Sequence, residues 1–168
     1  MNIEKSLSMH PTKNDLSADK RASAVAILND LLADLIDLQL QAKQAHWNVK
    51  GPNFIALHEL FDSVAEEAEE FVDTVAERIA ALGGRAEGTI GVVGQRSKLA
   101  PYPLDIVSGR AHVEALSTSL ATVGKGARQG IGRATEVGDA DTADLFTEVS
   151  RGIDKKLWFV ESHLQGDR

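Results

Sequence analysis

Apolar residues recur at helical spacing over most of this chain. Between residues 17 and 47 they alternate in steps of three and four, which is typical of a helix with one face against a core. Ser17 has a side chain suited to an N-cap, and Gly51-Pro52 interrupts the pattern. The pattern predicts a first helix from Ser17 to Trp47 with an inward-facing seam of Val25, Leu28, Leu32, Leu35, Gln39, Ala42 and His46.

A second helix is predicted over residues 53–82. It stops at Gly83-Gly84, a typical C-terminal signal. Its core positions are expected to be Leu57, Phe61, Val64, Ala68, Phe71, Val75, Ile79 and Leu82. Residues 85–108 are rich in glycine, contain Pro101 and Pro103, and are expected to form a long crossover with a short helix near residues 92–98.

Two further helices are predicted over residues 108–136 and 141–163. Four glycines (Gly124, Gly126, Gly130 and Gly132) weaken the first of them, each by about 1 kcal/mol relative to alanine. No β-alternation persists anywhere in the sequence. Two helical hairpins joined by one long crossover indicate an all-α, ferritin-like four-helix bundle with the crossover between helices two and three.

Size and charge limit the function classes. The chain has 168 residues, no cysteine and a net charge of −7. We expect a polar, flexible tail over residues 1–16 and one bundle domain over residues 17–168. No apolar run is long enough for a membrane span and no signal-peptide core is present, which favours the cytoplasm. An acidic body attracts cations and repels nucleic acid, so DNA binding would need a local basic segment.

The strongest chemical signal is a palindrome of metal-ligand side chains on the second helix. His58 and Asp62 form one i,i+4 pair, and Asp73 and Glu77 form another. All four point into a sector of about 100°, yet Asp62 and Asp73 are about 16 Å apart along a helix. One ion cannot bridge that distance. Two antiparallel copies around a two-fold axis would instead build two metal sites, each shared between subunits.

The ligand stripe borders the core, since His58 follows Leu57 and Asp62 follows Phe61. His46, across a short turn, can supply a further imidazole. Mixed imidazole and carboxylate ligands suit Fe(II), Mn(II) or Zn(II), and few ligands per ion leave open positions for an oxidant. The alternative is a solvated acidic face. Two more carboxylates near the stripe are either ligands or part of such a face: Glu66 and Glu69.

Five segments carry a family resemblance. They are QAHWNVKGPNFIALHELFD (44–62), DTVAERIAALGG (73–84), YPLDI (102–106), DTADLF (141–146) and LWFVESH (157–163). Together they resemble the Dps family of mini-ferritins, the DNA-binding proteins of starved cells, over roughly residues 13–164. The combination of HWN, a histidine twelve residues later and DxxAER is highly specific.

The resemblance implies a hollow homo-dodecamer with ferroxidase centres at its two-fold interfaces. In such a centre His46, His58 and Asp62 come from one subunit, and Asp73 and Glu77 from its neighbour. Iron is oxidised there from Fe(II) to Fe(III), preferably by hydrogen peroxide, and is stored as ferric mineral. Two-electron reduction of peroxide avoids hydroxyl radical and so protects DNA.

The resemblance also assigns outlying residues. Lys43 is similar to a position that contacts a weaker second iron site. Trp47 resembles a tryptophan beside the centre that donates an electron, with plain packing as the alternative, whereas Trp158 is expected in the core or an interface. Asp144, with Asp141, resembles the lining of a three-fold pore for iron entry, and Asp141 is also expected to be an N-cap.

DNA binding has weaker support in the sequence. The tail offers Lys5 and Lys13 against nearby acidic residues, which predicts at most a weak, salt-sensitive and sequence-independent association that would place the protein on the bacterial nucleoid. Three rivals to the ferroxidase stay open. They are a DNA-compacting protein with vestigial iron chemistry, a plain helical bundle with a solvated acidic face, and a cage that holds zinc or manganese.

Overall fold

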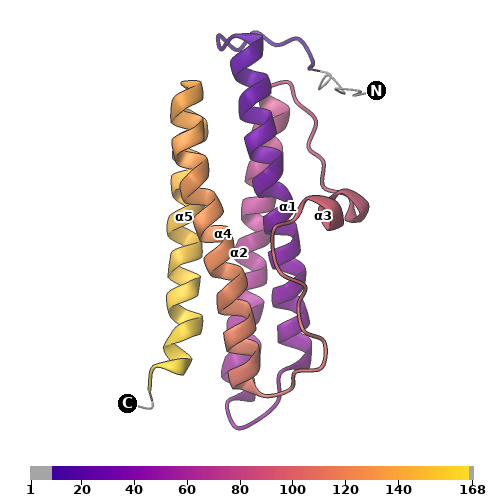
Figure 1. Ribbon diagram of the computed structural model, residues 1–168, viewed down its shortest axis with the longest axis vertical. Coiled ribbons are helices and arrows are strands. Elements are labelled where there is room, and N and C mark those ends of the chain that lie inside the picture. Colours follow the sequence, from indigo (N-terminus) through magenta and orange to yellow (C-terminus); the bar gives the residue numbers. More distant parts are fainter. Residues whose placement is uncertain (1–8, 167–168) are drawn as a thin grey trace.

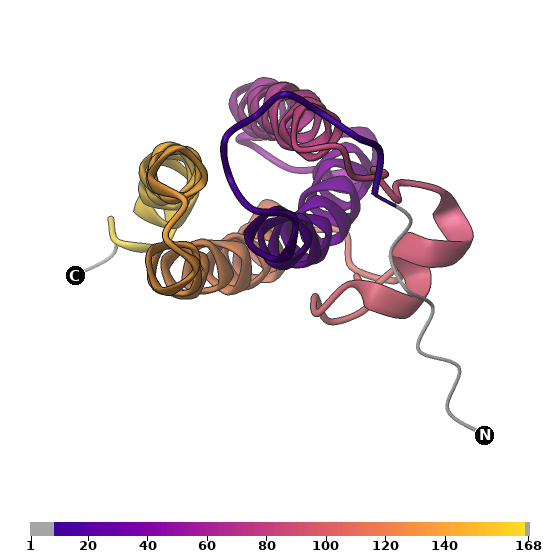
Figure 2. The same cartoon turned by 90° about the horizontal axis from the view of Figure 1, so that it is seen from above.

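The computed structural model describes residues 9–166, and this part of the chain is helical. Four long helices, α1 (Ala18–Asn48), α2 (Phe54–Ala81), α4 (Gly109–Val137) and α5 (Ala140–Glu161), run side by side (Figure 1). A short helix, α3 (Ile90–Arg96), lies outside the bundle (Figure 2), and a 3₁₀ turn (Ser162–Leu164) follows α5. The described part contains no β-strand. The predicted ferritin-like four-helix bundle is confirmed, with each long helix close to its expected position.

The core lies between two helical hairpins, α1 with α2 and α4 with α5. Because α1 also contacts α4 and the crossover, it buries side chains on several faces. Two positions of the expected seam are wrong: Gln39 and His46 are only partly buried, whereas their neighbours Leu38 and Ala45 are fully buried. The largest fully buried side chains include Phe61, Phe146 and Leu28.

Side-chain caps start three of the long helices. Ser17 Oγ accepts a hydrogen bond from Lys20 N, and Ser108 Oγ accepts one from Ala111 N. The expected N-cap at Asp141 is wrong. Asp139 caps α5, because its backbone is extended and its carboxylate accepts from Thr142 N at 3.1 Å, whereas Asp141 already lies in the first helical turn.

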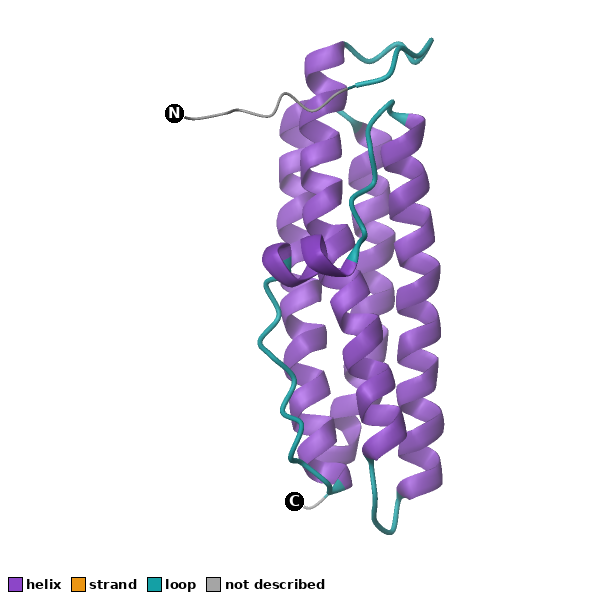
Figure 3. Ribbon diagram, turned by 90° about the vertical axis from the view of Figure 1, so that its right-hand side faces the viewer, coloured by secondary structure: helices purple, strands orange, loops and turns teal. Residues whose placement is uncertain are grey.

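The crossover runs along the outside of the bundle (Figure 3), and a row of polar side chains on α1 holds it there. Asn29 donates to Arg85 O and accepts from Glu87 N, and Gln41 donates to Ala100 O. Between these contacts, Asp34 accepts from Lys98 N at 2.8 Å. These contacts give the buried polar groups of α1 their hydrogen-bond partners and fix the path of the crossover.

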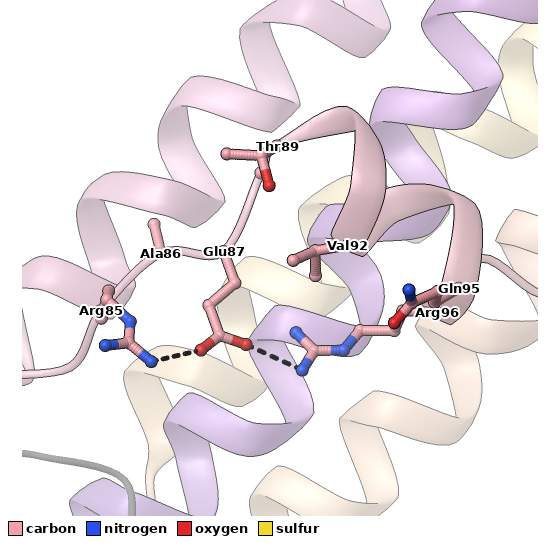
Figure 4. A pocket seen from close by; sticks show the side chains of 8 residues that line it. Arg85, Ala86, Glu87, Thr89, Val92, Gln95 and Arg96 are labelled. Atoms are coloured by element: carbon pink, nitrogen blue, oxygen red, sulfur yellow. Dashed lines mark hydrogen bonds and ion pairs between the residues drawn. The ribbon is translucent and has the colours of Figure 1, made fainter.

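Two ion pairs that share Glu87 connect the start of the crossover to α3. Arg85 and Arg96 both converge on Glu87, at 2.9 and 2.8 Å, across an open hollow of about 670 Å³ (Figure 4). Hydrogen bonds from the two guanidinium groups hold the pKa of Glu87 below its usual range. The bridge therefore ties α3 to the segment that leaves α2.

The segment before α1 crosses the end of α2. His10 N donates to Gly83 O at 2.7 Å, and Arg21 donates to Leu16 O and Leu82 O. Residues 1–8, half of the tail expected over residues 1–16, lie outside the described residues. No helix in residues 9–166 is long and apolar enough to cross a membrane.

Candidate metal centre

The short turn between α1 and α2 brings His46 and His58 face to face. Their ring centroids are 3.7 Å apart and the rings are inclined by 19°. His46 Nδ1 lies 2.7 Å from the backbone oxygen of His58, and His58 Nδ1 lies 2.8 Å from that of His46. A carbonyl oxygen only accepts, so each Nδ1 carries hydrogen and donates. In the neutral rings each Nε2 then keeps its lone pair for a metal ion.

Asp62 lies one helical turn after His58 and forms an ion pair with Lys43 of α1. The hydrogen bond from the Lys43 ammonium lowers the pKa of Asp62, against a smaller opposing effect of burial. Asp62 is therefore ionised at neutral pH, as a metal ligand must be. A metal ion bound by Asp62 would have to compete with Lys43 for the same carboxylate oxygen.

Asp73 and Glu77 lie nearer the other end of the same helix and are exposed. Since α2 is continuous from Phe54 to Ala81, eleven residues of helical rise separate Asp73 from Asp62, about 16 Å. One subunit therefore carries the two sets of candidate ligands at separate places. Within residues 9–166 no group of three His, Asp or Glu side chains is close enough to hold a metal ion.

Asp73 lines an open acidic groove of about 600 Å³. Glu66 and Glu69 line the same groove, together with Glu70, and all three are exposed. Within one subunit these carboxylates lie on a solvated face. Whether Glu66 and Glu69 act as additional ligands or form a solvated stripe therefore depends on which residues of a second subunit lie against this groove.

Both tryptophans are largely exposed in the subunit. Trp47, next to His46, is 64% exposed, so the packing alternative is not met within one chain. Trp158 on α5 is 60% exposed, and its expected place in the subunit core is wrong. The other alternative for Trp158, an interface between subunits, stays a prediction.

The candidate pore and DNA residues also lie at the surface. Asp141 and Asp144 are exposed on the first two turns of α5. Lys13 is exposed before α1, and Lys5 lies outside the described residues. These positions are accessible, and their roles stay predictions.

The sequence did not reveal a largely buried ion pair that joins α2 to the start of α5. Arg78, the residue after Glu77, donates to both carboxylate oxygens of Asp139 and to Thr142 Oγ1. The arginine of the DTVAER segment was the available signal, but nothing local in the sequence names its partner 61 residues away.

Known proteins similar to this chain have the same ferritin-like domain. The family model for the ferritin-like domain matches residues 25–168. The "DNA protection during starvation protein" of Agrobacterium fabrum is 46% identical over 156 residues, which cover 93% of this chain and 96% of that protein. The corresponding protein of Mycolicibacterium smegmatis is 36% identical over 149 residues, 88% of this chain and 81% of that protein.

Solved structures agree. DpsA14 from Streptomyces coelicolor superposes with a TM-score of 0.88 at 35% identity, covering 94% of each chain. Dps from Microbacterium arborescens, in a high-iron form, superposes with a TM-score of 0.84 at 32% identity, covering 93% of this chain and 99% of that one. With the histidine pair, the split ligand stripe and these matches along nearly the whole length, the chain belongs to the Dps family of ferritin-like proteins.

Proposed function

We propose that this protein oxidises Fe(II) at centres shared between two subunits and stores the ferric product inside a hollow homo-dodecamer. The observation that carries the proposal is the division of ligands along α2. His46, His58 and Asp62 lie near the turn between α1 and α2, while Asp73 and Glu77 are exposed about 16 Å farther along α2. An antiparallel partner helix completes both half-sites at once.

The substrate chemistry follows from the ligand types. Imidazole nitrogen and carboxylate oxygen bind Fe(II) and also tolerate Fe(III), and an incomplete shell admits hydrogen peroxide. Peroxide takes one electron from each of two Fe(II) ions and is reduced to the level of water, so no hydroxyl radical is released. Zinc or manganese at the same ligands would bind without that turnover, and the assay below separates them.

Iron would reach the interior past the start of α5. Asp144 and Asp141 are exposed there, and a symmetric ring of such carboxylates would concentrate Fe(II) from solution. This route would join the outside of the shell to its interior. It also places the entry point close to Arg78 and Asp139, which hold the start of α5.

Protection of DNA would then be chemical. The related proteins are named for DNA protection during starvation, and removal of Fe(II) together with peroxide accounts for it without contact. The net charge of −7 opposes binding to phosphates, and Lys13 is an isolated basic residue in the described part before α1. DNA compaction remains the second candidate, tested by shell–DNA association in low salt.

Mixing two defective variants tests the shared centre. His46→Ala/His58→Ala removes one half-site, and Asp73→Ala/Glu77→Ala removes the other. In a mixed dimer one centre carries all the lesions and the other carries none. Random mixing should therefore restore about a quarter of the wild-type centres, although each variant alone is inactive. Ferric absorbance after anaerobic Fe(II) loading and a peroxide pulse measures the recovery.

Assembly of every sample is checked by light scattering. Glu66→Ala/Glu69→Ala removes two further carboxylates from the same groove; full activity in this variant would place them on a solvated face, and a loss of activity would make them additional ligands. If cages reassembled from mixed subunits of the two variants are intact but recover no activity, the centre is not shared. If the wild type itself oxidises iron no faster than the double variants, the ferroxidase function is wrong.

A further inference from the structure

The open hollow between the start of the crossover and α3 presents two guanidinium groups with free donors. Arg85 and Arg96 lie on opposite sides of Glu87 (Figure 4), and each donates to it through Nη2, at 2.9 and 2.8 Å. A guanidinium carries several N–H donors, so most donors of both arginines are not used by Glu87. Neither arginine makes another side-chain hydrogen bond within the part of the chain that the structure describes. Nothing in the proposed iron chemistry uses these residues.

One carboxylate faces two positive charges in this hollow. Hydrogen bonds from Arg85 and then from Arg96 lower the pKa of Glu87, so its carboxylate is ionised at neutral pH. The other residues that line the hollow carry no charge: Ala86, Gly88, Thr89, Val92 and Gln95. The hollow therefore keeps an excess of positive charge, although the chain as a whole has a net charge of −7. Such a site attracts anions.

The carboxylate of Glu87 does not block the approach of an anion. Glu87 is the most enclosed of the three side chains, with 19% exposure against 31% for Arg96 and 66% for Arg85. Its two oxygens each accept from one of the arginines. The solvent-facing side of this cluster is therefore formed more by N–H donors than by the carboxylate.

One donor of Arg96 lacks an acceptor. Its Nη1 is buried, and it has no hydrogen-bond partner within residues 9–166. Buried N–H groups are almost always paired, and an unpaired one on a charged group is costly. The observation points to a missing acceptor. Because the Arg96 side chain as a whole is partly exposed, a small turn of its guanidinium would bring Nη1 to an oxyanion in the hollow.

Two uncharged donors line the same hollow. Thr89 occupies the N-cap position of α3, yet its side chain makes no capping hydrogen bond. A threonine at this position usually accepts from the helix backbone, so here its hydroxyl is left for another partner. Gln95 is exposed, and its amide can also donate. Charged and neutral donors therefore surround one space.

A buried side chain of α1 fixes the segment that carries Arg85 and Glu87. Asn29 donates to Arg85 O at 3.1 Å and accepts from Glu87 N at 2.9 Å. Both backbone groups are thereby held against the bundle, and the two side chains project from a fixed base. Donors that are positioned before binding lose less conformational entropy when a ligand arrives.

We propose that this hollow binds a phosphate group, carried by inorganic phosphate or by a small phosphate monoester. Guanidinium groups recognise phosphate by paired hydrogen bonds, and two of them on opposite sides favour a ligand with more oxygens than a carboxylate has. A volume of about 670 Å³ leaves room for an organic group beside the phosphate. The site is separate from the iron centre and does not depend on the proposed ferroxidase function.

Calorimetry on the assembled, iron-free protein tests the proposal, with inorganic phosphate as the probe at fixed ionic strength. The wild type is expected to show one saturable site per subunit. Arg85→Met and Arg96→Met should each weaken binding by at least about tenfold, because each removes one guanidinium. Arg96→Lys keeps the charge but loses the paired donors, so it should weaken binding by at least about threefold.

Arg110→Met is the matched control. Arg110 also pairs with a glutamate, Glu114, and its side chain is 65% exposed, close to the 66% of Arg85. It lies at the start of α4 and does not line the hollow, so phosphate should bind to this variant as to the wild type. Light scattering and circular dichroism check the assembly and helicity of every variant. If Arg96→Met does not assemble, Arg85→Met and Arg96→Lys decide.

Three results would overturn the proposal. The first is the absence of saturable phosphate binding in the wild type. The second is an equal loss of binding in Arg85→Met and Arg110→Met, which would indicate general attraction to surface charge. The third is wild-type affinity in Arg96→Lys, since recognition would then not need the guanidinium.

A nucleoside monophosphate distinguishes the two sources of the phosphate group. Binding at least about tenfold tighter than that of inorganic phosphate would assign the site to a phosphate monoester, and similar binding would assign it to inorganic phosphate. A short DNA duplex is the last probe. If the duplex binds to the wild type but not to Arg85→Met, and free phosphate does not bind, the hollow is a nucleic-acid contact and the proposal is wrong.

Discussion

Arg78 and Asp139 form a two-pronged ion pair that joins α2 to the start of α5. Arg78 Nη2 lies 2.9 and 3.1 Å from the two carboxylate oxygens of Asp139, whose side chain is 2% exposed. Arg78 directly follows Glu77, and Asp139 caps the helix that carries Asp141 and Asp144. One buried contact therefore positions both a proposed iron ligand and the proposed entry pore.

Replacing Asp139 should destabilise the fold. Asp139→Ala removes the cap and leaves Arg78 without its carboxylate, at an expected cost of about 2–4 kcal/mol in urea unfolding at fixed protein concentration. Asp141→Ala is the control, since Asp141 is exposed and should cost less than about 1 kcal/mol. Equal losses for the two variants would mean that Asp139 is not the cap that holds α5.

The same pair predicts a pH dependence. Burial opposes the charge of Asp139, but hydrogen bonds from Thr142 and Arg78 outweigh it and lower its pKa below 3.8. A lowered folded-state pKa stabilises the fold above the ordinary pKa, and this contribution is lost as the pH falls through the lowered one. The stability gap between wild type and Asp139→Ala should therefore narrow below pH 3.8. A gap that stays constant there would contradict the ionised pair.

Asp34 predicts the opposite sign. Burial raises its pKa, although Lys98 N donates to it. The fold therefore disfavours the charged form and loses stability as the pH rises through the raised pKa. Asp34→Asn keeps an acceptor and removes the charge, so its urea midpoint should exceed that of the wild type at pH 7, and the advantage should shrink toward pH 4. A lower midpoint at pH 7 would show that Asn cannot replace the carboxylate here.

Two glycines of α4 should respond oppositely to alanine. A Cβ added at Gly130 would overlap the ring of Phe146, whereas one added at Gly132 meets no atom within 4 Å. Gly130→Ala should therefore destabilise the fold by about 1–3 kcal/mol through overpacking. Gly132→Ala should stabilise it by about 1 kcal/mol through helix propensity. Thermal unfolding of both variants is the measurement, and similar shifts would argue against the close approach of α4 to α5.

Lys43 should weaken metal binding, because it forms an ion pair with the candidate ligand Asp62. Lys43→Met removes the ion-pair partner of Asp62 and frees its carboxylate. Because exposed ion pairs are worth about 0.2–1 kcal/mol, Fe(II) affinity in anaerobic calorimetry should rise by up to about fivefold. Lys50→Met, which removes an exposed charge from the nearby turn, is the control. Weaker binding in Lys43→Met would make Lys43 a contributor to the site.

The pore proposal predicts a kinetic effect without loss of the centre. Asp144→Asn should slow iron uptake at low Fe(II) concentration, because the field that concentrates cations is reduced, while oxidation at saturating Fe(II) stays unchanged. Stopped-flow traces over a range of Fe(II) concentrations measure both. Equal slowing at all concentrations would place Asp144 in the chemistry rather than on the route.

The sequence by itself determined the helices and the separation of the candidate ligands along the second helix. Both depend on the 3.6-residue period, which is local, so apolar spacing located α1, α2, α4 and α5, and the helical rise alone separated Asp62 from Asp73. The pairing of His46 with His58 at the α1–α2 turn could also be predicted from the sequence, because a short connection must bring the two residues close together.

Only the tertiary structure decided the contacts between segments distant in sequence. The reciprocal hydrogen bonds of His46 and His58 depend on how α1 and α2 are rotated about their axes. The ion pair of Arg78 with Asp139 and the hydrogen bond between Tyr102 and His112 form because the crossover and the α4–α5 hairpin pack in one particular register. Helical periodicity specifies which face a residue occupies, but the partner across that face is set by packing of whole elements.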